Sequence, residues 1–149
     1  MTKSNSHIPP GFHTVTPYIV VPGIARLLDF LTQAFGAIEK ERMKREDGSI
    51  AHAAVTLGDS IIEMGEAVDK KSMPMTFHVY FPNVDEMYKR ALAAGAKSLS
   101  EPTDQFYGER SAGLTDAWGN HWYIATYTDE LTPEELSARA GTQGESAHE

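Results

Sequence analysis

The chain of 149 residues contains no cysteine. This absence excludes disulfide bonds, thiolate metal ligands and cysteine nucleophiles. Long apolar runs are missing too, since no stretch approaches the about 18 residues that span a bilayer. Residues 1–10 are polar and proline-rich and lack the apolar segment of a signal peptide. We therefore expect a cytoplasmic protein with no membrane partner.

Basic residues are scarce, with 13 lysines and arginines against 21 aspartates and glutamates and a net charge of -8. Nucleic-acid binding needs clustered positive charge, and the densest basic stretch, residues 40–45, contains Glu41. We therefore expect no nucleic-acid partner. The glycines stand singly at turns, so the sequence also lacks a glycine-rich phosphate loop and a nucleophile elbow.

One pattern occurs twice: an apolar strand, a proline turn and an amphipathic helix that ends at a glycine. It covers residues 15–36 and again residues 76–95. A repeat of this length is usually one supersecondary unit used twice. Two such units place equivalent sheet faces opposite each other across a pseudo-two-fold axis, and the resulting cleft is where a ligand is expected.

Periodicity predicts three strands after the first helix and three after the second. The expected first-module elements are a strand at 15–21, a helix at 24–35 and strands at 37–44, 50–57 and 60–65. Those of the second module are a strand at 75–81, a helix at 84–94 and strands at 97–100, 108–115 and 120–126. Thr132-Pro133-Glu134-Glu135 is typical of a helix start.

The expected organisation follows from these elements. It comprises a flexible arm (1–11), a first βαβββ module (12–66), a linker (67–74), a second βαβββ module (75–128), a C-terminal helix (129–140) and a disordered tail (141–149).

Several short segments carry a resemblance to a known family. They are Thr14-Val15-Thr16-Pro17-Tyr18, Phe30 with Ala34-Phe35-Gly36-Ala37, His52-Ala53, Gly58-Asp59-Ser60, His78-Val79-Tyr80, Ala93-Ala94-Gly95-Ala96, Gln105-Phe106-Tyr107-Gly108-Glu109-Arg110 and Asp116-Ala117-Trp118-Gly119-Asn120-His121-Trp122. With the element order, residues 11 to 136 resemble the vicinal-oxygen-chelate superfamily (glyoxalase, bleomycin-resistance and extradiol dioxygenase fold), and within it the PhnB-like branch. The resemblance implies an α+β fold in which two βαβββ modules form an incomplete barrel around a cleft. It also implies a homodimer.

The resemblance also implies where a metal would sit. Metal-dependent members place a ligand on the first and the last strand of each module, and these positions here are Thr16, Glu63, Thr76 and Tyr123. Of these, Glu63 alone is a good ligand for a hard or borderline divalent ion. The usual metal site is therefore expected to be incomplete.

A displaced site is the alternative. Strand alternation places His52 and His78 on the faces away from the helices, and with Glu63 they are candidate ligands for Mn, Fe, Ni or Zn. Without a metal, His52 or His78 is a candidate general base and Glu63 a candidate acid. A half-buried histidine hydrogen-bonded in a sheet is the structural interpretation of the same pattern.

Polar and aromatic side chains suggest how a ligand would be held. Arg110 is a candidate clamp for an acidic group, although it is also placed to pair with Glu109 or Asp116. The other candidate ligand-binding residues are Tyr18, Gln105, Phe106, Tyr107, His121 and Tyr123. We expect a protein that binds a small polar or acidic molecule in the inter-module cleft, without the usual complete metal site.

Two other functions stay open. One is a metal-dependent lyase, isomerase or dioxygenase that uses His52, Glu63 and His78. The other is a non-catalytic dimeric interaction protein with a filled cleft.

Overall fold

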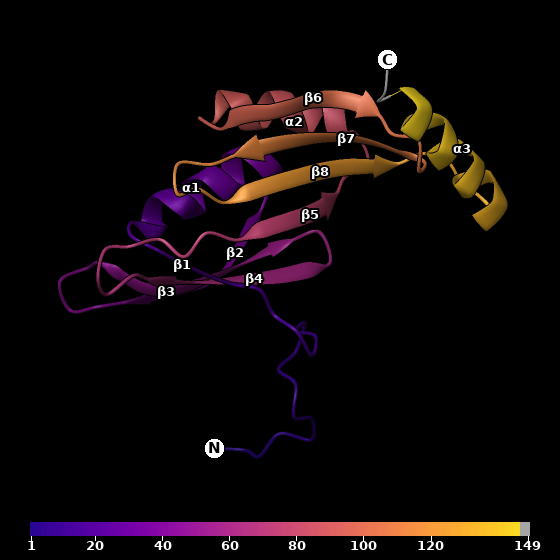
Figure 1. The fold of residues 1–149 in the computed structure, drawn as a ribbon. Coiled ribbons are helices and arrows are strands. Elements are labelled where there is room, and N and C mark those ends of the chain that lie inside the picture. Colours follow the sequence, from indigo (N-terminus) through magenta and orange to yellow (C-terminus); the bar gives the residue numbers. More distant parts are fainter. Residues whose placement is uncertain (147–149) are drawn as a thin grey trace. The chain divides into compact units, whose positions relative to one another are not determined.

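The computed structural model describes residues 1–146, and the chain divides into two compact units, Met1–Met75 and Thr76–Glu149. Each unit holds a four-stranded sheet and a helix in the order βαβββ, and the second unit also contains a C-terminal helix (Figure 1). The predicted α+β class with two βαβββ modules is therefore confirmed. The cleft between the modules and the homodimer stay predictions. Within the described residues, no helix combines the length and the apolar character that crossing a membrane requires.

The first module consists of β1 (Tyr18–Val21), α1 (Ile24–Phe35), β2 (Ile38–Lys44), β3 (Ile50–Leu57) and β4 (Ser60–Glu66). The strand order is β1-β4-β3-β2, with β1 parallel to β4 and the other pairs antiparallel. Strand β1 begins at Tyr18, later than predicted. Pro17 has no N–H for a ladder hydrogen bond, and Val15 is 81% exposed.

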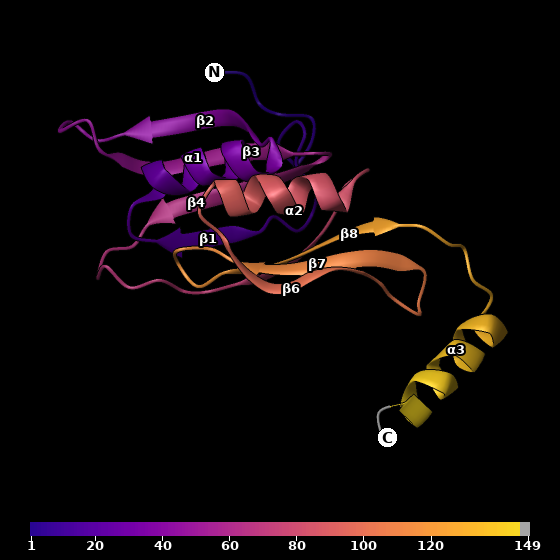
Figure 2. The same cartoon turned by 90° about the horizontal axis from the view of Figure 1, so that it is seen from above.

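Helix α1 covers one face of this sheet with its buried leucines and phenylalanines (Figure 2). It ends at Gly36, which has φ 70° as predicted for a left-handed cap. Its start is unusual because Gly23 offers no capping side chain. Instead, the carboxylate of Glu66 on β4 accepts the Gly23 N–H at 2.9 and 2.7 Å, so the last strand of the module satisfies the helix N-terminus.

The second module consists of β5 (Thr76–Tyr80), α2 (Val84–Ala93), β6 (Lys97–Asp104), β7 (Glu109–Thr115) and β8 (His121–Tyr127). Its strand order, β5-β8-β7-β6, repeats that of the first module. Asn83 caps α2 by accepting the Glu86 N–H at 3.2 Å. Trp122 is fully buried and stacks on Phe77 with ring centroids 4.3 Å apart, so this tryptophan is a core residue.

Asp116 organises the turn between β7 and β8. Its buried carboxylate accepts the backbone N–H groups of Trp118 and Asn120 at 2.9 and 3.0 Å. It also accepts the Asn120 side-chain amide and the Trp122 indole N–H, both at 2.9 Å. Asp116 therefore orders the turn and also anchors the core tryptophan.

Helix α3 (Pro133–Ser146) begins as predicted, with the Thr132 hydroxyl accepting the Glu135 N–H at 3.2 Å. It extends past residue 140, where the sequence predicts a disordered tail from residue 141. Gly141 and Gly144 lower helix propensity, but unlike proline they keep the backbone hydrogen bonds. Residues 147–149 of the expected tail lie outside the described residues.

Candidate functional site

A β-bulge in β2 creates a carboxylate and imidazole cluster on the face of the first sheet away from α1. Glu39 pairs with Val55, but Glu41 pairs with Ala54, because the register shifts between the two glutamates. The shift turns Glu41 to the face that carries His52 and Glu63. Sequence alternation alone gives Glu39 and Glu41 the same face, so it could not identify Glu41.

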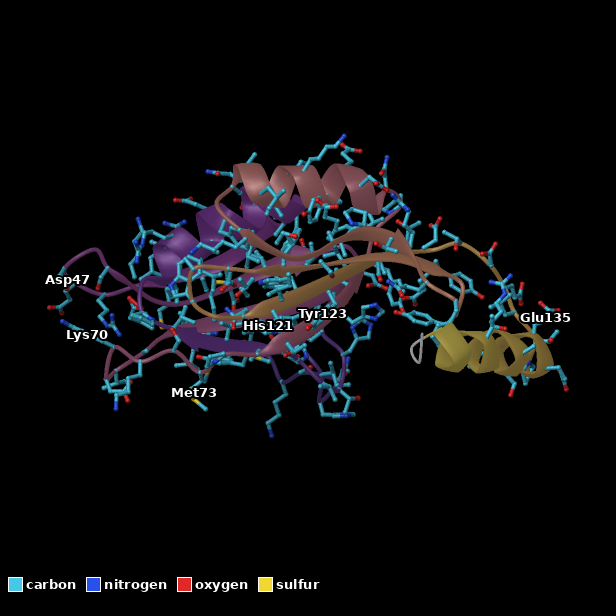
Figure 3. All side chains as sticks on the ribbon, turned by 45° about the horizontal axis from the view of Figure 1, so that its top comes forward. Asp47, Lys70, Met73, His121, Tyr123 and Glu135 are labelled. Carbon is cyan, nitrogen blue, oxygen red and sulfur yellow. The ribbon has the colours of Figure 1, made fainter. Side chains whose placement is uncertain are left out.

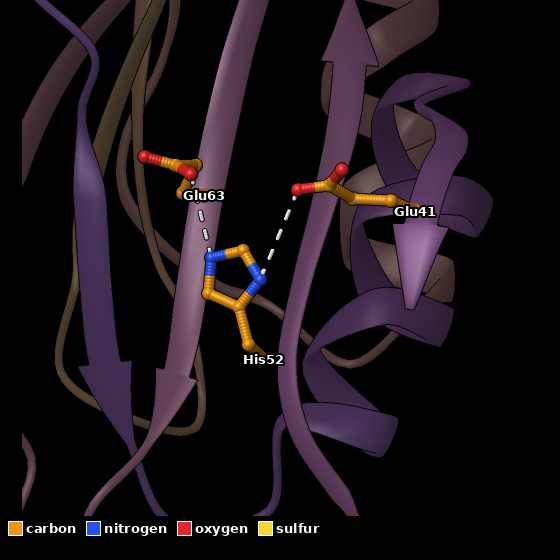
Figure 4. Close-up of side chains that lie close together, drawn as sticks. All are labelled: Glu41, His52 and Glu63. Atoms are coloured by element: carbon orange, nitrogen blue, oxygen red, sulfur yellow. Dashed lines mark ion pairs between the residues drawn. The ribbon is translucent and has the colours of Figure 1, made fainter. Parts of the chain in front are cut away.

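His52 lies between the two carboxylates (Figure 4). Its Nε2 is 3.4 Å from Oε1 of Glu63, and its Nδ1 is 3.9 Å from Oε1 of Glu41. All three side chains are partly accessible, and one ligand atom from each lies within 4.8 Å of the others. The structure thus brings together His52 and Glu63, as predicted, and adds Glu41.

Tyr18 forms one edge of this cluster. Its ring lies 5.7 Å from that of His52, and its hydroxyl crosses over Gly65. A Cβ at Gly65 would be 2.6 Å from the Tyr18 hydroxyl, so the absence of a side chain is what admits the tyrosine. Tyr18, a predicted ligand-binding residue, therefore lies beside the cluster.

A pocket of about 510 Å³ opens next to these side chains. It is lined by residues of the arm, by residues at the start of the first module and by two glutamates: His7, Ile8, Pro9, Phe12, His13, Thr14, Thr16, Glu41 and Glu63. Residues 11 and 12 lie against the sheet: the Phe12 ring is 5.8 Å from the Lys40 ammonium, and Gly11 lies near Ile61. The segment expected to be a flexible arm thus supplies three of the lining residues, His7, Ile8 and Pro9.

His78, the third predicted cluster member, lies in the second unit and has a different partner. Its Nε2 is 3.4 Å from Oε2 of Glu109, and its ring meets that of Tyr80 edge-on at 4.7 Å. The Tyr80 hydroxyl donates to Oε1 of Glu109 at 2.8 Å. The second unit therefore has its own group of His78, Tyr80 and Glu109, of which sequence reasoning identified His78 alone.

The hydrogen bond to Glu109 raises the pKa of the Tyr80 phenol, and desolvation and the nearby negative charge act in the same direction. Glu109→Gln removes this charge and is expected to lower the Tyr80 pKa towards its ordinary value. The ¹³Cζ resonance of Tyr80 measures the titration directly. An unchanged titration in the variant would contradict the assignment.

The raised pKa of Tyr80 also makes the stability of the folded protein depend on pH. Because folding favours the protonated phenol, the contribution of Tyr80 to stability is present below about pH 10 and is lost as the pH rises through the folded-state pKa.

Arg110, the predicted ligand clamp, is already engaged. Its Nε and one terminal nitrogen bind both oxygens of Asp85 at 2.8 and 3.0 Å, and its other nitrogen is 3.3 Å from Asp104. The pairing holds the pKa of Asp85 below its usual range. Arg110 therefore ties α2 to the sheet, and its partners are neither Glu109 nor Asp116.

The remaining predicted ligand-binding residues all lie in the second unit. Gln105, Phe106 and Tyr107 form the turn between β6 and β7, with Gly108 N–H donating to the Gln105 carbonyl at 3.3 Å. His121 and Tyr123 alternate onto one face of β8, with ring centroids 6.3 Å apart (Figure 3). The turn adjoins Arg110 along the hairpin, whereas His121 and Tyr123 lie on the opposite face of the sheet from Arg110.

The four metal positions implied by the resemblance divide between the units. Thr16 and Glu63 both line the pocket of the first unit. Thr76 and Tyr123 are on strands β5 and β8 of the second. Two threonines and a tyrosine are poor ligands for a divalent ion, so the residues present do not fit the usual superfamily metal site.

Comparison with known proteins identifies relatives that match over most of the chain. The chain is 32% identical over 143 residues to the uncharacterized protein Mb0911c of Mycobacterium bovis, covering 88% of this chain and 94% of that protein. The uncharacterized protein Rv0887c of Mycobacterium tuberculosis is equally identical, and 84% of its length is covered.

Among solved structures, TioX from Micromonospora sp. ML1 has a similar fold, with a TM-score of 0.68 and 22% identity over 77% of this chain and 98% of TioX. A Bacillus cereus protein described as a putative 3-demethylubiquinone-9 3-methyltransferase, PhnB protein, has a TM-score of 0.61 and 15% identity over 76% of this chain and 99% of its own. The sequence profile of the Glyoxalase/Bleomycin resistance protein/Dioxygenase superfamily matches residues 11–124. The chain therefore belongs to the glyoxalase, bleomycin resistance protein and dioxygenase superfamily.

Proposed function

We propose that this protein binds a small polar molecule in the pocket of its first module. The observation that carries the proposal is the pocket itself, whose volume of about 510 Å³ falls in the range of roughly 300–1,000 Å³ that is usual for ligand sites. Partly accessible acidic and imidazole groups beside an apolar wall are the usual composition of such a site.

The charges at the pocket define the ligand class. Glu41 and Glu63 both line it, and no lysine or arginine does so among the residues that surround it. The carboxylates accept hydrogen bonds, so we propose a ligand that presents N–H or O–H donors. An acidic ligand would be repelled unless a cation bound first.

We also propose that the chain belongs to the PhnB-like branch. The short segments quoted for the resemblance support this assignment, and so does the similar fold of the Bacillus cereus protein. Membership of this branch would not imply a particular reaction, because the fold alone does not determine the chemistry.

A screen of small neutral and cationic fragments by saturation-transfer NMR tests the binding proposal. We expect hits that compete with one another for a single site and that carry hydrogen-bond donors. A screen with no hits, or hits that bind equally well to Glu63→Gln protein, would contradict the proposal.

A divalent metal at Glu41, His52 and Glu63 is the second candidate, and the observation in its favour is the proximity of one nitrogen and two oxygen ligand atoms. A metal ion would supply a Lewis acid next to the pocket. The two glutamates lie against different ring nitrogens of His52. A single ion takes one of these nitrogens, so one glutamate would have to change its rotamer.

Elemental analysis of protein purified without chelators tests this candidate. It predicts about one Mn, Fe, Ni or Zn ion per chain, lost in both His52→Ala and Glu63→Gln. His78→Ala is the matched control and is expected to keep the metal. Protein that takes up no ion after metal addition, or that keeps its metal in both variants, would eliminate the candidate.

A further inference from the structure

Glu109 contains a buried carboxylate oxygen that lacks a hydrogen bond among the described residues. The side chain is only 10% exposed. Oε1 accepts the Tyr80 hydroxyl, whereas Oε2 has the His78 ring nitrogen at 3.4 Å, without the geometry of a hydrogen bond. A buried carboxylate oxygen without a donor is costly, so a ligand that supplied the donor would be stabilised here.

The surface around this oxygen is aromatic. Tyr127 lies directly opposite Glu109 in the β7–β8 register, and Tyr80 reaches Glu109 across β8. The strand partner of Tyr80 is Ala125, whose small side chain leaves room for the tyrosine to cross. Tyr80 and Tyr127 are 58% and 60% exposed, so both side chains are accessible to a ligand.

The charge of Glu109 is not balanced by a neighbouring lysine or arginine. Among the ion pairs of the described residues, its partner is His78. The adjacent Arg110 belongs to the other face of the sheet, where Asp85 and Asp104 take up its donors. A buried carboxylate that lacks a lysine or arginine partner and lies beside exposed tyrosines favours a cationic ligand.

We propose that this face of the second module binds an organic ammonium group, on a primary or secondary amine. The ammonium N–H donates to Oε2 of Glu109, and the flanking carbon atoms lie against the rings of Tyr80 and Tyr127. A quaternary ammonium lacks the N–H and binds more weakly. The site lies within the second unit, and none of its residues is among those that line the pocket proposed for the first.

Isothermal titration calorimetry with 2-phenylethylammonium chloride tests this site, and 2-phenylethanol is the neutral control. We expect one saturable site for the ammonium and binding of the alcohol at least about tenfold weaker. Glu109→Gln, which preserves size and removes the charge, is expected to weaken ammonium binding at least about thirtyfold. The matched control is Glu101→Gln at an exposed position of β6, which is expected to leave ammonium binding unchanged. Glu63→Gln is measured in parallel to detect binding in the first-module pocket.

Three results would overturn the inference: no saturable binding, equal binding of the alcohol, or unchanged binding in Glu109→Gln. The comparison with the alcohol uses the unmodified protein, so it stands even if Glu109→Gln folds poorly by circular dichroism. Loss of binding in Glu63→Gln alone would place the probe in the first-module pocket. That result would overturn this inference and support the proposed function.

Discussion

Asp116→Ala is expected to lower the free energy of unfolding by roughly 3–5 kcal/mol. The carboxylate accepts four hydrogen bonds. Two of the donors, on Asn120 and Trp122, belong to fully buried side chains. Alanine removes the acceptor that these buried donors bind, and the loss of a hydrogen-bond partner costs a buried polar group about 1–3 kcal/mol. Urea unfolding followed by tryptophan fluorescence measures the loss, because both tryptophans of the chain, Trp118 and Trp122, adjoin this turn.

The matched control is Asp59→Ala in the corresponding turn of the first module. Asp59 is exposed and accepts one hydrogen bond, from the Ser60 hydroxyl at 3.1 Å. Its removal is expected to change the stability by less than about 0.5 kcal/mol. Equal losses in the two variants would contradict the anchoring role of Asp116.

Thr16→Trp is expected to weaken binding of the pocket ligand at least about thirtyfold, which is roughly 2 kcal/mol. Thr16 lines the pocket just before β1 begins. The indole would occupy the volume that the ligand needs, while the position outside a helix or strand limits the cost to folding. Affinities of the fragment hits, measured by NMR titration, report the effect.

Thr32→Trp is the control for this substitution. Thr32 is exposed on α1, which packs on the opposite face of the same sheet from the Glu41, His52 and Glu63 cluster. The control is expected to keep the affinity of the unmodified protein within about twofold. If Thr16→Trp kept it as well, the ligand would bind elsewhere.

The sequence predicted the fold well because local signals agree with tertiary structure. Helix α1 ends at Gly36 as expected, and β3 has the predicted bounds Ile50–Leu57. The alternation of β3 also placed His52 correctly on the face away from α1, next to Glu63. These features depend on periodicity and glycine turns, which a single sequence carries.

The site was harder to predict because three of its features are not local. Glu41 reaches the cluster through a bulge that no periodicity signals. Glu109 binds Tyr80 across an intervening strand, and the small Ala125 permits this. Arg110 pairs with Asp85 on α2, a contact that packing of the helix decides. The alternation along a strand predicts which face of the sheet a side chain lies on, but it does not predict which residue of another element that side chain contacts.

We propose that the ligand site lies in the first module, and an amide-resolved NMR titration with the best fragment hit tests this placement. We expect the perturbed amides to fall in residues 7–16 and around Glu41, His52 and Glu63. Perturbations confined to residues 76–127, with the first module unchanged, would contradict it.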